Sequence, residues 1–300
     1  MSKQIPEFLE EMLIKQYREQ ITQKIIQGYS IKRPVTLRVN TIKTDIEKVK
    51  KYLEGQEIKF KEVEWSKQAL ILEDVREDKI KELEIYKNGE IYLQSLSSMI
   101  PPIILKPEAD ENILDMAAAP GGKTTQMAAI SNNQAMITAC EKNKIRAERL
   151  KYNLEKQGAN RVTVMLQDAT QLDEFFSFDK ILLDAPCSGS GTISIQDEKL
   201  EKIFTKELVE RTVKTQEKLL QKALKLLKPG KEMVYSTCSI LAQENENILK
   251  KVLAKTNAEI VPIETDFKTD LLPVTIPGTI CICPTELYEG FFVAKIKKKI

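Results

Sequence analysis

From Asn112 onward the chain alternates short apolar segments with amphipathic ones, and this alternation constrains the fold more than any other feature. Strands separated by helices form right-handed βαβ units, which assemble into a mostly parallel sheet. The predicted strands are Ile113–Met116, Ala135–Cys140, Val162–Leu166, Lys180–Leu183, Glu232–Tyr235 and Phe291–Ala294. The predicted helices are Lys123–Ile130, Lys144–Gln157, Lys206–Leu227 and Gln243–Lys255, with Gly230 separating the third helix from the next strand. The pattern predicts an α/β fold with a doubly wound, Rossmann-like sheet, whose ligands bind at the carboxyl ends of the strands.

The amino-terminal part of the chain follows a different pattern. Apolar residues recur with helical spacing over residues 6–27, and Val35–Val39 is typical of a strand. A helix over Asp45–Leu53, a strand near Ile58–Val63 and the strand-like Ala69–Leu72 complete a small α+β module. We place the boundary near residue 90, between a helical and α+β module of residues 1–90 and a sheet domain of residues 91–300.

The chain contains no histidine, which excludes several classes of enzyme. Hydrolases with a histidine base and zinc sites with histidine ligands cannot be built from this composition. The five cysteines are an odd number scattered through 300 residues, which favours free thiols over a disulfide framework. The sequence shows neither a short apolar signal segment nor an apolar stretch long enough to span a membrane. We therefore expect a soluble, cytoplasmic protein.

Cations gather near the amino terminus, although the net charge of the chain is only +2. In the stretch Ile14–Lys43, Tyr17 and Tyr29 are interleaved with seven cationic side chains. The cationic residues are Lys15, Arg18, Lys24, Lys32, Arg33, Arg38 and Lys43. Interleaved cations and aromatic rings predict a surface that faces phosphates. Solvated helices of a lysine-rich protein would show the same pattern, so both interpretations stay open.

A turn rich in small residues, Asp115–Thr124, comes at the end of the first strand of the sheet domain and opens a helix. Its glycines allow a ligand to approach the backbone closely, and the helix start supplies unpaired N–H donors. The turn resembles a phosphate-binding loop, but the G-x-x-x-x-G-K-[ST] pattern needs glycine where this chain has Ala117. A nucleoside triphosphate site is therefore the weaker interpretation.

Four strands in succession deliver a carboxylate to the same edge of the predicted sheet. Asp115, Glu141, Asp168 and Asp184 each come at or just after the end of a strand. Because the chain has no G-x-G-x-x-G motif, the pattern fits S-adenosylmethionine better than NAD. Asp115 would hold the methionine end, Glu141 the ribose and Asp168 the adenine amine, with Asp184 bordering the same site. The residues expected to hold the methionine end with Asp115 are Ala117, Ala118, Ala119, Pro120, Gly121, Gly122 and Lys123.

Two cysteines lie in turns rich in proline, glycine, serine and threonine. Cys187 follows the fourth strand within Asp184–Gly191, and Cys238 follows the fifth within Tyr235–Ser239. Because the carboxyl ends of parallel strands meet at one edge, both thiols should project toward the proposed methyl donor. Cys140 lies inside a strand and is interpreted as packing.

These motifs resemble those of the RNA 5-methylcytosine methyltransferases of the Sun/Nop family. The matching segments are Arg38–Thr41, Gln94–Pro102, Asp115–Thr124, Asp184–Gly189, Tyr235–Ser239 and Glu244–Glu246. The resemblance covers nearly the whole chain and is greatest to the short archaeal-type tRNA enzymes. It implies S-adenosylmethionine as the cofactor and RNA as the partner, with tRNA favoured over rRNA. The strand–helix–strand pattern of the amino-terminal module resembles a small RNA-recognition fold.

The resemblance also implies a covalent mechanism. Cys238 would add to C6 of the cytosine, C5 would take the methyl group, and Cys187 would assist the release of Cys238. Asp184 would hydrogen-bond the N3/N4 edge of the base, which must first leave its stack. In the absence of histidine, the charge of the methyl donor and Lys123 are the candidate sources of the field that ionises Cys238.

Several alternatives are weighed against this function. They are an rRNA cytosine-5 methyltransferase, a DNA cytosine methyltransferase and a catalytically silent RNA-binding assembly factor. Thr285 stands where many relatives carry histidine, and Ile193–Asp197 replaces an arginine-rich stretch, which bears on the RNA substrate. Cys281 and Cys283 form a C-x-C pair without a second pair, so we expect no metal. We further expect a monomer.

Overall fold

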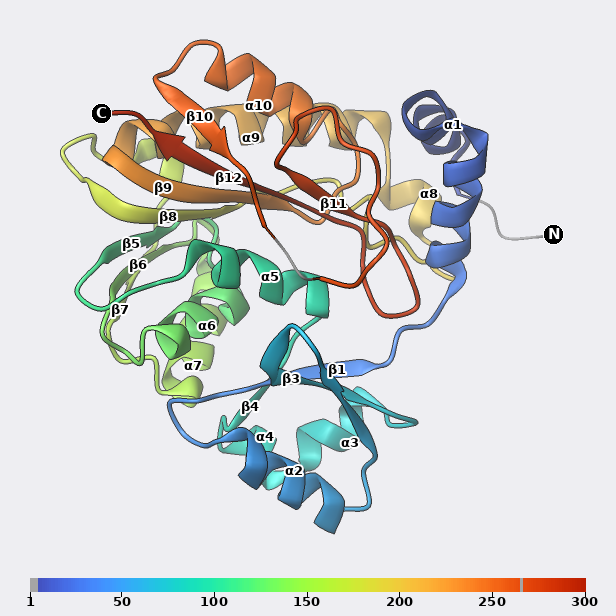
Figure 1. The fold of residues 1–300 in the computed structure, drawn as a ribbon, viewed down its shortest axis with the longest axis vertical. Helices are drawn as coiled ribbons and strands as arrows, with labels where there is room; N and C mark the ends of the chain where they lie inside the picture. The colour runs from blue at the N-terminus through green and yellow to red at the C-terminus, as the bar shows by residue number, and fades with distance from the viewer. Residues whose placement is uncertain (1–4, 265–266) are drawn as a thin grey trace. The chain divides into compact units, whose positions relative to one another are not determined.

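The computed structural model describes residues 5–264 and 267–300. By its internal contacts the chain divides into two compact units. The central unit is Pro34–Leu182, and the terminal unit joins Met1–Arg33 to Leu183–Ile300. Figure 1 shows the course of the chain through both units.

The central unit begins with a small antiparallel sheet. Its strands are β1 (Val35–Val39), β2 (Phe60–Val63), β3 (Ser66–Leu72) and β4 (Ile91–Leu93), in the order β2-β3-β1-β4. Its helices are α2 (Ile46–Gly55), α3 (Glu77–Glu82) and α4 (Glu84–Lys87). Leu37, Leu53 and Leu70 lie in its core without solvent exposure. The predicted strand over Val35–Val39 is confirmed residue for residue.

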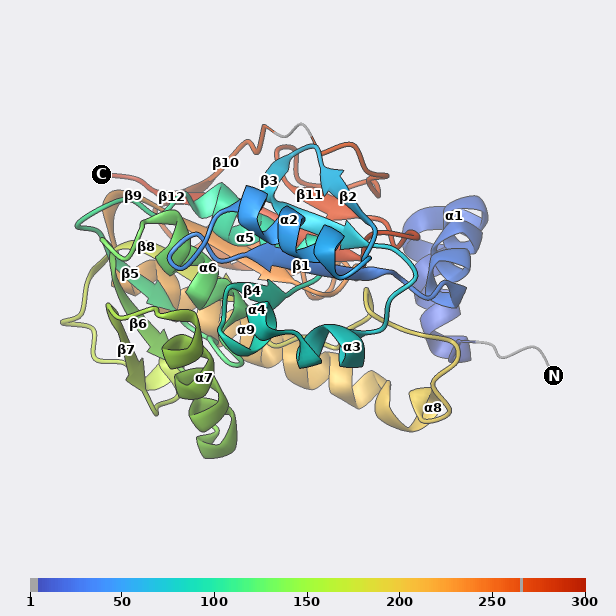
Figure 2. The same cartoon turned by 90° about the horizontal axis from the view of Figure 1, so that it is seen from below.

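The same unit continues into parallel strands. They are β5 (Asn112–Asp115), β6 (Met136–Cys140), β7 (Val162–Met165) and β8 (Phe178–Asp184), with β5 pairing with both β6 and β8, and β6 with β7. The connecting helices are α5 (Leu96–Leu105), α6 (Gly122–Ile130), α7 (Lys144–Gln157) and the short η1 (Ala169–Gln171). Both ribbon views show β5, β6 and β7 side by side (Figure 1 and Figure 2). The predicted βαβ pattern is therefore present.

The terminal unit takes up the end of β8 and carries antiparallel strands. They are β9 (Leu227–Thr237), β10 (Ala258–Val261), β11 (Ile280–Ile282) and β12 (Phe291–Lys298), and β12 pairs with each of the other three. Its helices are α1 (Glu7–Ser30), α8 (Leu200–Ile203), α9 (Lys206–Leu226) and α10 (Glu246–Leu253). Helix α1 is two helices merged at Arg18, whose φ is 64°.

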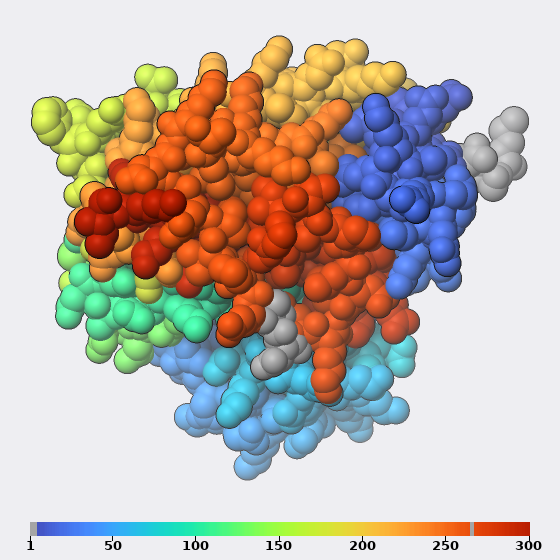
Figure 3. Space-filling view, turned by 45° about the horizontal axis from the view of Figure 1, so that its top comes forward, coloured from blue at the N-terminus to red at the C-terminus, as the bar shows by residue number. Residues whose placement is uncertain are grey.

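Helix α1 packs against the carboxyl-terminal part of the chain. Lys24 forms an ion pair with Asp270 at 2.8 Å, and the hydroxyl of Tyr17 donates to the carbonyl of Ile240 at 2.6 Å. A β-carbon on Gly28 would lie 2.1 Å from the carbonyl oxygen of Pro284, so the helix backbone meets this segment directly. Figure 3 shows the blue surface of α1 against the orange and red surface of the carboxyl-terminal residues of the same unit.

One predicted boundary is wrong. Gly230 does not separate the helix from the following strand, because α9 ends at Leu226 and β9 already includes Gly230. The backbone leaves the helix at Leu227, whose φ and ψ are −74° and 129°. Gly230 instead supplies a positive φ of 75° inside the strand, which glycine tolerates better than any other residue.

Within residues 5–264 and 267–300, no helix has the length and apolar character that crossing a membrane requires.

Candidate active site

Asp115 fixes the small-residue turn after β5. It is the last residue of that strand and is 1% exposed. Its carboxylate accepts a hydrogen bond from the hydroxyl of Thr124 at 2.7 Å and a longer one from the N–H of Ala117 at 3.4 Å. Both ends of the turn are thus tied to the same side chain. The predicted position of Asp115 at a strand end is confirmed.

Helix α7 and strand β6 hold the backbone of this turn from the other side. The N–H of Ala118 donates to the carbonyl of Cys140 at 2.9 Å. Arg146 donates to the carbonyl of Ala119 at 2.7 Å, and Asn153 donates to that of Pro120 at 2.8 Å. The turn therefore has a defined shape that its own short side chains do not provide.

Gly121 and Gly122 are required by the geometry of the turn. Gly121 has a φ of 110° and precedes the first residue of α6. A β-carbon there would lie 3.0 Å from Leu150, and one on Gly122 would lie 3.1 Å from the ring of Tyr92. The first turn of an α-helix leaves N–H groups without partners inside the helix, which favours an anionic ligand at this end.

The carboxylates that follow β6 and β7 have different environments. Glu141 is 5% exposed, accepts from the N–H of Asn143 at 2.8 Å and lies 3.4 Å from a guanidinium nitrogen of Arg146. Asp168 is half-buried and accepts from both the N–H and the hydroxyl of Thr170. Burial raises the pKa of Asp168, but these hydrogen bonds outweigh it and hold the pKa below its ordinary value. Asp168 is therefore a carboxylate at neutral pH.

The ammonium of Lys123 has a hydrogen-bond partner in its own unit. Lys123 is half-buried, and its ammonium donates to the hydroxyl of Ser98 at 2.8 Å within the central unit. Its suggested role in ionising Cys238 stays a prediction.

In the terminal unit the two predicted cysteines meet. The sulfur atoms of Cys187 and Cys238 are 3.1 Å apart, and both residues are half-buried. The hydrogen bond to Cys238 and burial raise the pKa of Cys187 well above its ordinary value. Cys187 therefore keeps its proton at neutral pH. Asp184 ends β8 and accepts a hydrogen bond from the hydroxyl of Ser236 at 2.8 Å.

Hydrogen bonds join the turn of Cys187 to the turn of Cys238. The N–H of Gly191 donates to the carbonyl of Cys238 at 2.9 Å, and the hydroxyls of Ser190 and Ser239 are 2.8 Å apart. Both hydroxyls are fully buried. The sequence does not predict these serine contacts, nor the hydrogen bond from Ser236 to Asp184. Their only signal in the sequence is the abundance of serine and threonine around both cysteines.

The other three cysteines are buried. Cys140 is inside β6 without solvent exposure, as predicted, and burial raises its pKa to about 12. Burial also raises the pKa of Cys283 to about 11 and that of Cys281 further. Over the described residues, no group of three or more cysteine, aspartate and glutamate side chains forms a metal site.

The predicted phosphate-facing surface near the amino terminus is partly wrong. Tyr17, Tyr29 and Arg38 are buried and so do not face solvent. Their polar groups have partners inside the protein: each tyrosine hydroxyl donates to a backbone carbonyl, and Arg38 donates to Gln94 and Thr125. The exposed cations of that stretch are Lys15, Arg18, Lys24, Lys32 and Lys43.

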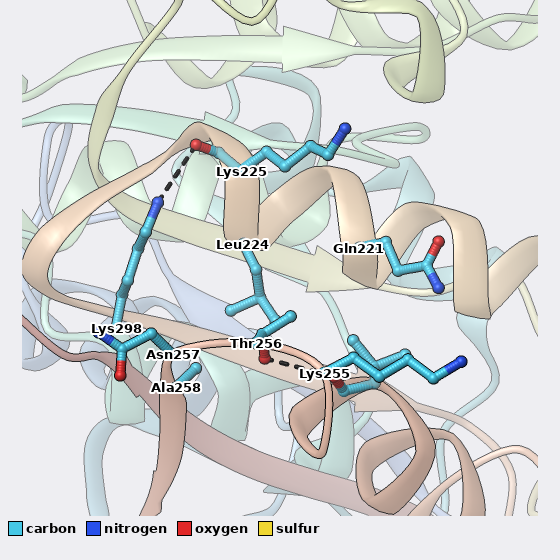
Figure 4. A pocket seen from close by; sticks show the side chains of 9 residues that line it. Gln221, Leu224, Lys225, Lys255, Thr256, Asn257, Ala258 and Lys298 are labelled. Carbon is cyan, nitrogen blue, oxygen red and sulfur yellow. Dashed lines mark hydrogen bonds between the residues drawn. The ribbon is translucent and has the colours of Figure 1, made fainter.

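A pocket of about 410 Å³ lies elsewhere in the terminal unit (Figure 4). Helices α9 and α10, β10 and β12 border it, and Leu224, Lys225, Lys255 and Lys298 are among its lining residues. Lys298 donates to the carbonyl of Lys225 at 3.3 Å. None of the predicted site residues lines this pocket, so it is separate from the thiol pair.

Comparison with known proteins identifies the family. The model of the 16S rRNA methyltransferase RsmB/F family matches residues 102–297. The chain belongs to the RsmB/F family. A second model, the ferredoxin-like domain of RsmF/B-like methyltransferases, matches residues 5–77. The resemblance to the Sun/Nop RNA cytosine-5 methyltransferases is therefore confirmed, and S-adenosylmethionine is the cofactor that this family membership indicates.

Individual relatives differ in length from this RsmB/F member. It is 35% identical to the tRNA (cytosine(49)-C(5))-methyltransferase of Pyrococcus abyssi, over 90% of this chain and 89% of that protein. It is also 35% identical to ribosomal RNA small subunit methyltransferase F of Shewanella sp. (strain ANA-3), over 88% of this chain but only 56% of that protein. The chain thus spans little more than half the length of several curated relatives.

A solved structure supports the fold. The methyltransferase homolog protein from Pyrococcus horikoshii is 31% identical, with a TM-score of 0.82, and the match covers 99% of this chain and 100% of that one. The predicted fold class, a Rossmann-like methyltransferase sheet with a small amino-terminal α+β module, is confirmed.

Proposed function

We propose that this chain methylates C5 of cytosine in RNA through a covalent bond between Cys238 and C6 of the base. The observation that carries the proposal is the pair of sulfur atoms 3.1 Å apart, in turns that follow β8 and β9, within a chain of the RsmB/F family. A silent assembly factor would have no need of two facing thiols. A DNA cytosine methyltransferase, which uses a single thiol, would not need the second.

The steps balance around the two sulfur atoms. The thiolate of Cys238 would form a bond to C6, which makes C5 nucleophilic. C5 would then take the methyl group as the S–CH3 bond of the donor breaks, with S-adenosylhomocysteine as the leaving group. Loss of the C5 proton to a base allows the C6–S bond to break and returns the thiolate of Cys238. The raised pKa of Cys187 keeps the proton on that thiol, and in the proposal Cys238 is the attacking thiol. In the proposal Cys187 assists the release step.

Asp184 would contact the N3/N4 edge of the base. The hydroxyl of Ser236 orients one of its carboxylate oxygens. A fixed hydrogen-bonding group at that edge stabilises charge that develops on the ring during attack. The target cytosine must be unpaired or flipped, which costs a few kcal/mol of stacking.

S-adenosylmethionine, when bound, supplies an electrophilic methyl group. The central unit fits it: the Asp115 turn is closed by backbone contacts and offers a helix start, and carboxylates follow β6 and β7. In the proposal Asp115 and residues 117–123 hold the methionine end, Glu141 the ribose and Asp168 the adenine amine. One oxygen of Glu141 accepts from Asn143 and the other lies near Arg146, and each carboxylate oxygen has a second lone pair for a further donor.

The proposed RNA is tRNA. Support comes from similarity to the archaeal tRNA enzyme, which is 35% identical over 90% of this chain. An rRNA substrate is the second candidate, since other relatives of similar identity act on rRNA by name. RNA binding by the amino-terminal module, the boundary near residue 90, a monomeric state, a cytoplasmic location and the absence of a metal stay predictions.

The test uses purified protein, methyl-labelled S-adenosylmethionine, and separate tRNA and small-subunit rRNA transcripts. We expect label in tRNA at cytosine C5, located by bisulfite sequencing. Label confined to rRNA would overturn the tRNA assignment, and label at no cytosine C5 in either RNA would overturn the proposed reaction.

A further inference from the structure

Glu244 is a buried carboxylate at the centre of the thiol turns. It has no solvent exposure and lies between β9 and α10. One oxygen accepts from the N–H of Ser188 at 2.8 Å, from the hydroxyl of Thr212 at 2.7 Å and from the amide of Gln216 at 3.2 Å. The other oxygen accepts from the hydroxyls of Ser188 at 2.5 Å and Ser239 at 2.6 Å.

These contacts connect Glu244 to both cysteines through their neighbours in the chain. Ser188 directly follows Cys187, and Ser239 directly follows Cys238. A carboxylate with no solvent exposure is costly unless hydrogen bonds satisfy it. Here all five donors are neutral, so they stabilise the negative charge without neutralising it.

The charge acts on the proton of Cys187. The ionisable groups that act on this thiol are Cys238 and Glu244, and the thiol in turn acts on Tyr235. The hydrogen bond to Cys238 is the largest cause of the raised pKa of Cys187, burial is the second, and the charge of Cys238 and then that of Glu244 add to it. A negative charge nearby disfavours a second negative charge on the sulfur.

We infer that Glu244 is a positioning residue that holds the two cysteine turns in register and disfavours loss of the proton from Cys187. The inference rests on the proposed roles of the two cysteines. It assigns to a carboxylate the control of proton location that many thiol enzymes obtain from histidine, which this chain lacks.

The experiment measures thiol reactivity, which requires neither RNA nor methyl donor. Native protein is treated with iodoacetamide between pH 6 and 10, and mass spectrometry quantifies alkylation at Cys187 and Cys238 separately. In the wild type, Cys238 should react first. In Glu244→Gln the ratio of Cys187 to Cys238 alkylation should rise roughly tenfold near pH 8, because the negative charge that disfavours the Cys187 thiolate is removed.

The matched control is Glu246→Gln. Glu246 is also buried, at 3% exposure, and accepts from the N–H of Thr275 rather than from a cysteine turn. This variant should keep the wild-type ratio. A folded Glu244→Gln protein with the wild-type ratio would overturn the inference, as would a control that shifts equally.

A second variant covers the case in which Glu244→Gln does not fold. Ser188→Ala removes one of the two hydrogen bonds between the Cys187 turn and Glu244 and leaves the backbone N–H bond in place. The Cys187 turn is then held less firmly, so the ratio of Cys187 to Cys238 alkylation should rise by a smaller factor. If this variant leaves the ratio unchanged, the inference fails. If the variants change the alkylation ratio as expected but the wild-type protein methylates no RNA, the proposed function is rejected and the role of Glu244 stands.

Discussion

Gly121→Ala tests the cofactor turn through backbone strain. Gly121 has a φ of 110° and a ψ of 2°, a region that residues with a β-carbon rarely occupy. Holding alanine there costs on the order of 1–3 kcal/mol. The new β-carbon would also lie 3.0 Å from Cδ1 of Leu150, a side-chain end that shifts at little cost. The strain is therefore mainly in the backbone.

The turn can respond to this strain in two ways, and a separate measurement detects each. If the turn keeps its shape, the melting temperature should fall by about 2–4 °C per kcal/mol. If the turn relaxes instead, S-adenosylmethionine should bind roughly 5- to 150-fold more weakly, the factor equivalent to 1–3 kcal/mol. Differential scanning fluorimetry and isothermal titration calorimetry measure the two quantities.

Gly55→Ala is the matched control. Gly55 ends α2, and a β-carbon there would meet nothing within 4 Å. Alanine in a helix is favoured by up to about 1 kcal/mol, so this variant should be neutral or slightly stabilised. If Gly121→Ala matches this control in both melting temperature and affinity, the reasoning about the turn is refuted.

Three further predictions concern sulfur and its surroundings. Cys238→Ala should abolish methylation, whereas Cys187→Ala should accumulate a protein–RNA adduct visible on a denaturing gel. Full activity in Cys238→Ala, or the lack of an adduct in Cys187→Ala, would contradict the assigned roles. Ser236→Ala removes a donor to Asp184 worth about 1–3 kcal/mol, so kcat should fall roughly tenfold with little change in cofactor affinity, and an unchanged kcat would count against it. Burial, followed by the charges nearby, raises the pKa of Cys140 to about 12, so the protonated thiol is favoured in the fold. The free energy of unfolding should therefore fall by up to about 1.4 kcal/mol per pH unit above pH ~9, and Cys140→Ala should have a flatter profile in alkaline urea titrations.

The helices and strands that were predictable from the sequence carry local signals. Helix α7 begins and ends where predicted because Asn143 accepts from the N–H of Arg146 at its start and Gly158 takes a φ of 70° after its end. Helix α5 was not predicted, since Pro101 and Pro102 lie inside it. Proline normally disfavours a helix interior, and burial of the helix overrides that preference here.

The candidate site was predictable at the level of its turns but not of its contacts. The strand-end rule placed Asp115 and Asp184 correctly, because it depends only on parallel strands ending at one edge. The partners of Glu244 come from the Cys187 turn, α9 and the Cys238 turn, which are far apart in the sequence. Polar contacts of this kind have no periodicity, so only the folded chain reveals them.

The absence of histidine gives these contacts their chemical meaning. A thiol of ordinary pKa is only a few per cent ionised at neutral pH, and no imidazole is present to remove its proton. Two thiols 3.1 Å apart offer another way to stabilise a thiolate, because the thiol that keeps its proton can form a hydrogen bond to the ionised sulfur of the other. With Cys187 as the donor, that hydrogen bond would stabilise an ionised Cys238, and the charge of Glu244 disfavours loss of the proton from Cys187. On this view the second cysteine contributes before the attack on C6 as well as at release, so an adduct in Cys187→Ala should form more slowly than the wild-type enzyme turns over.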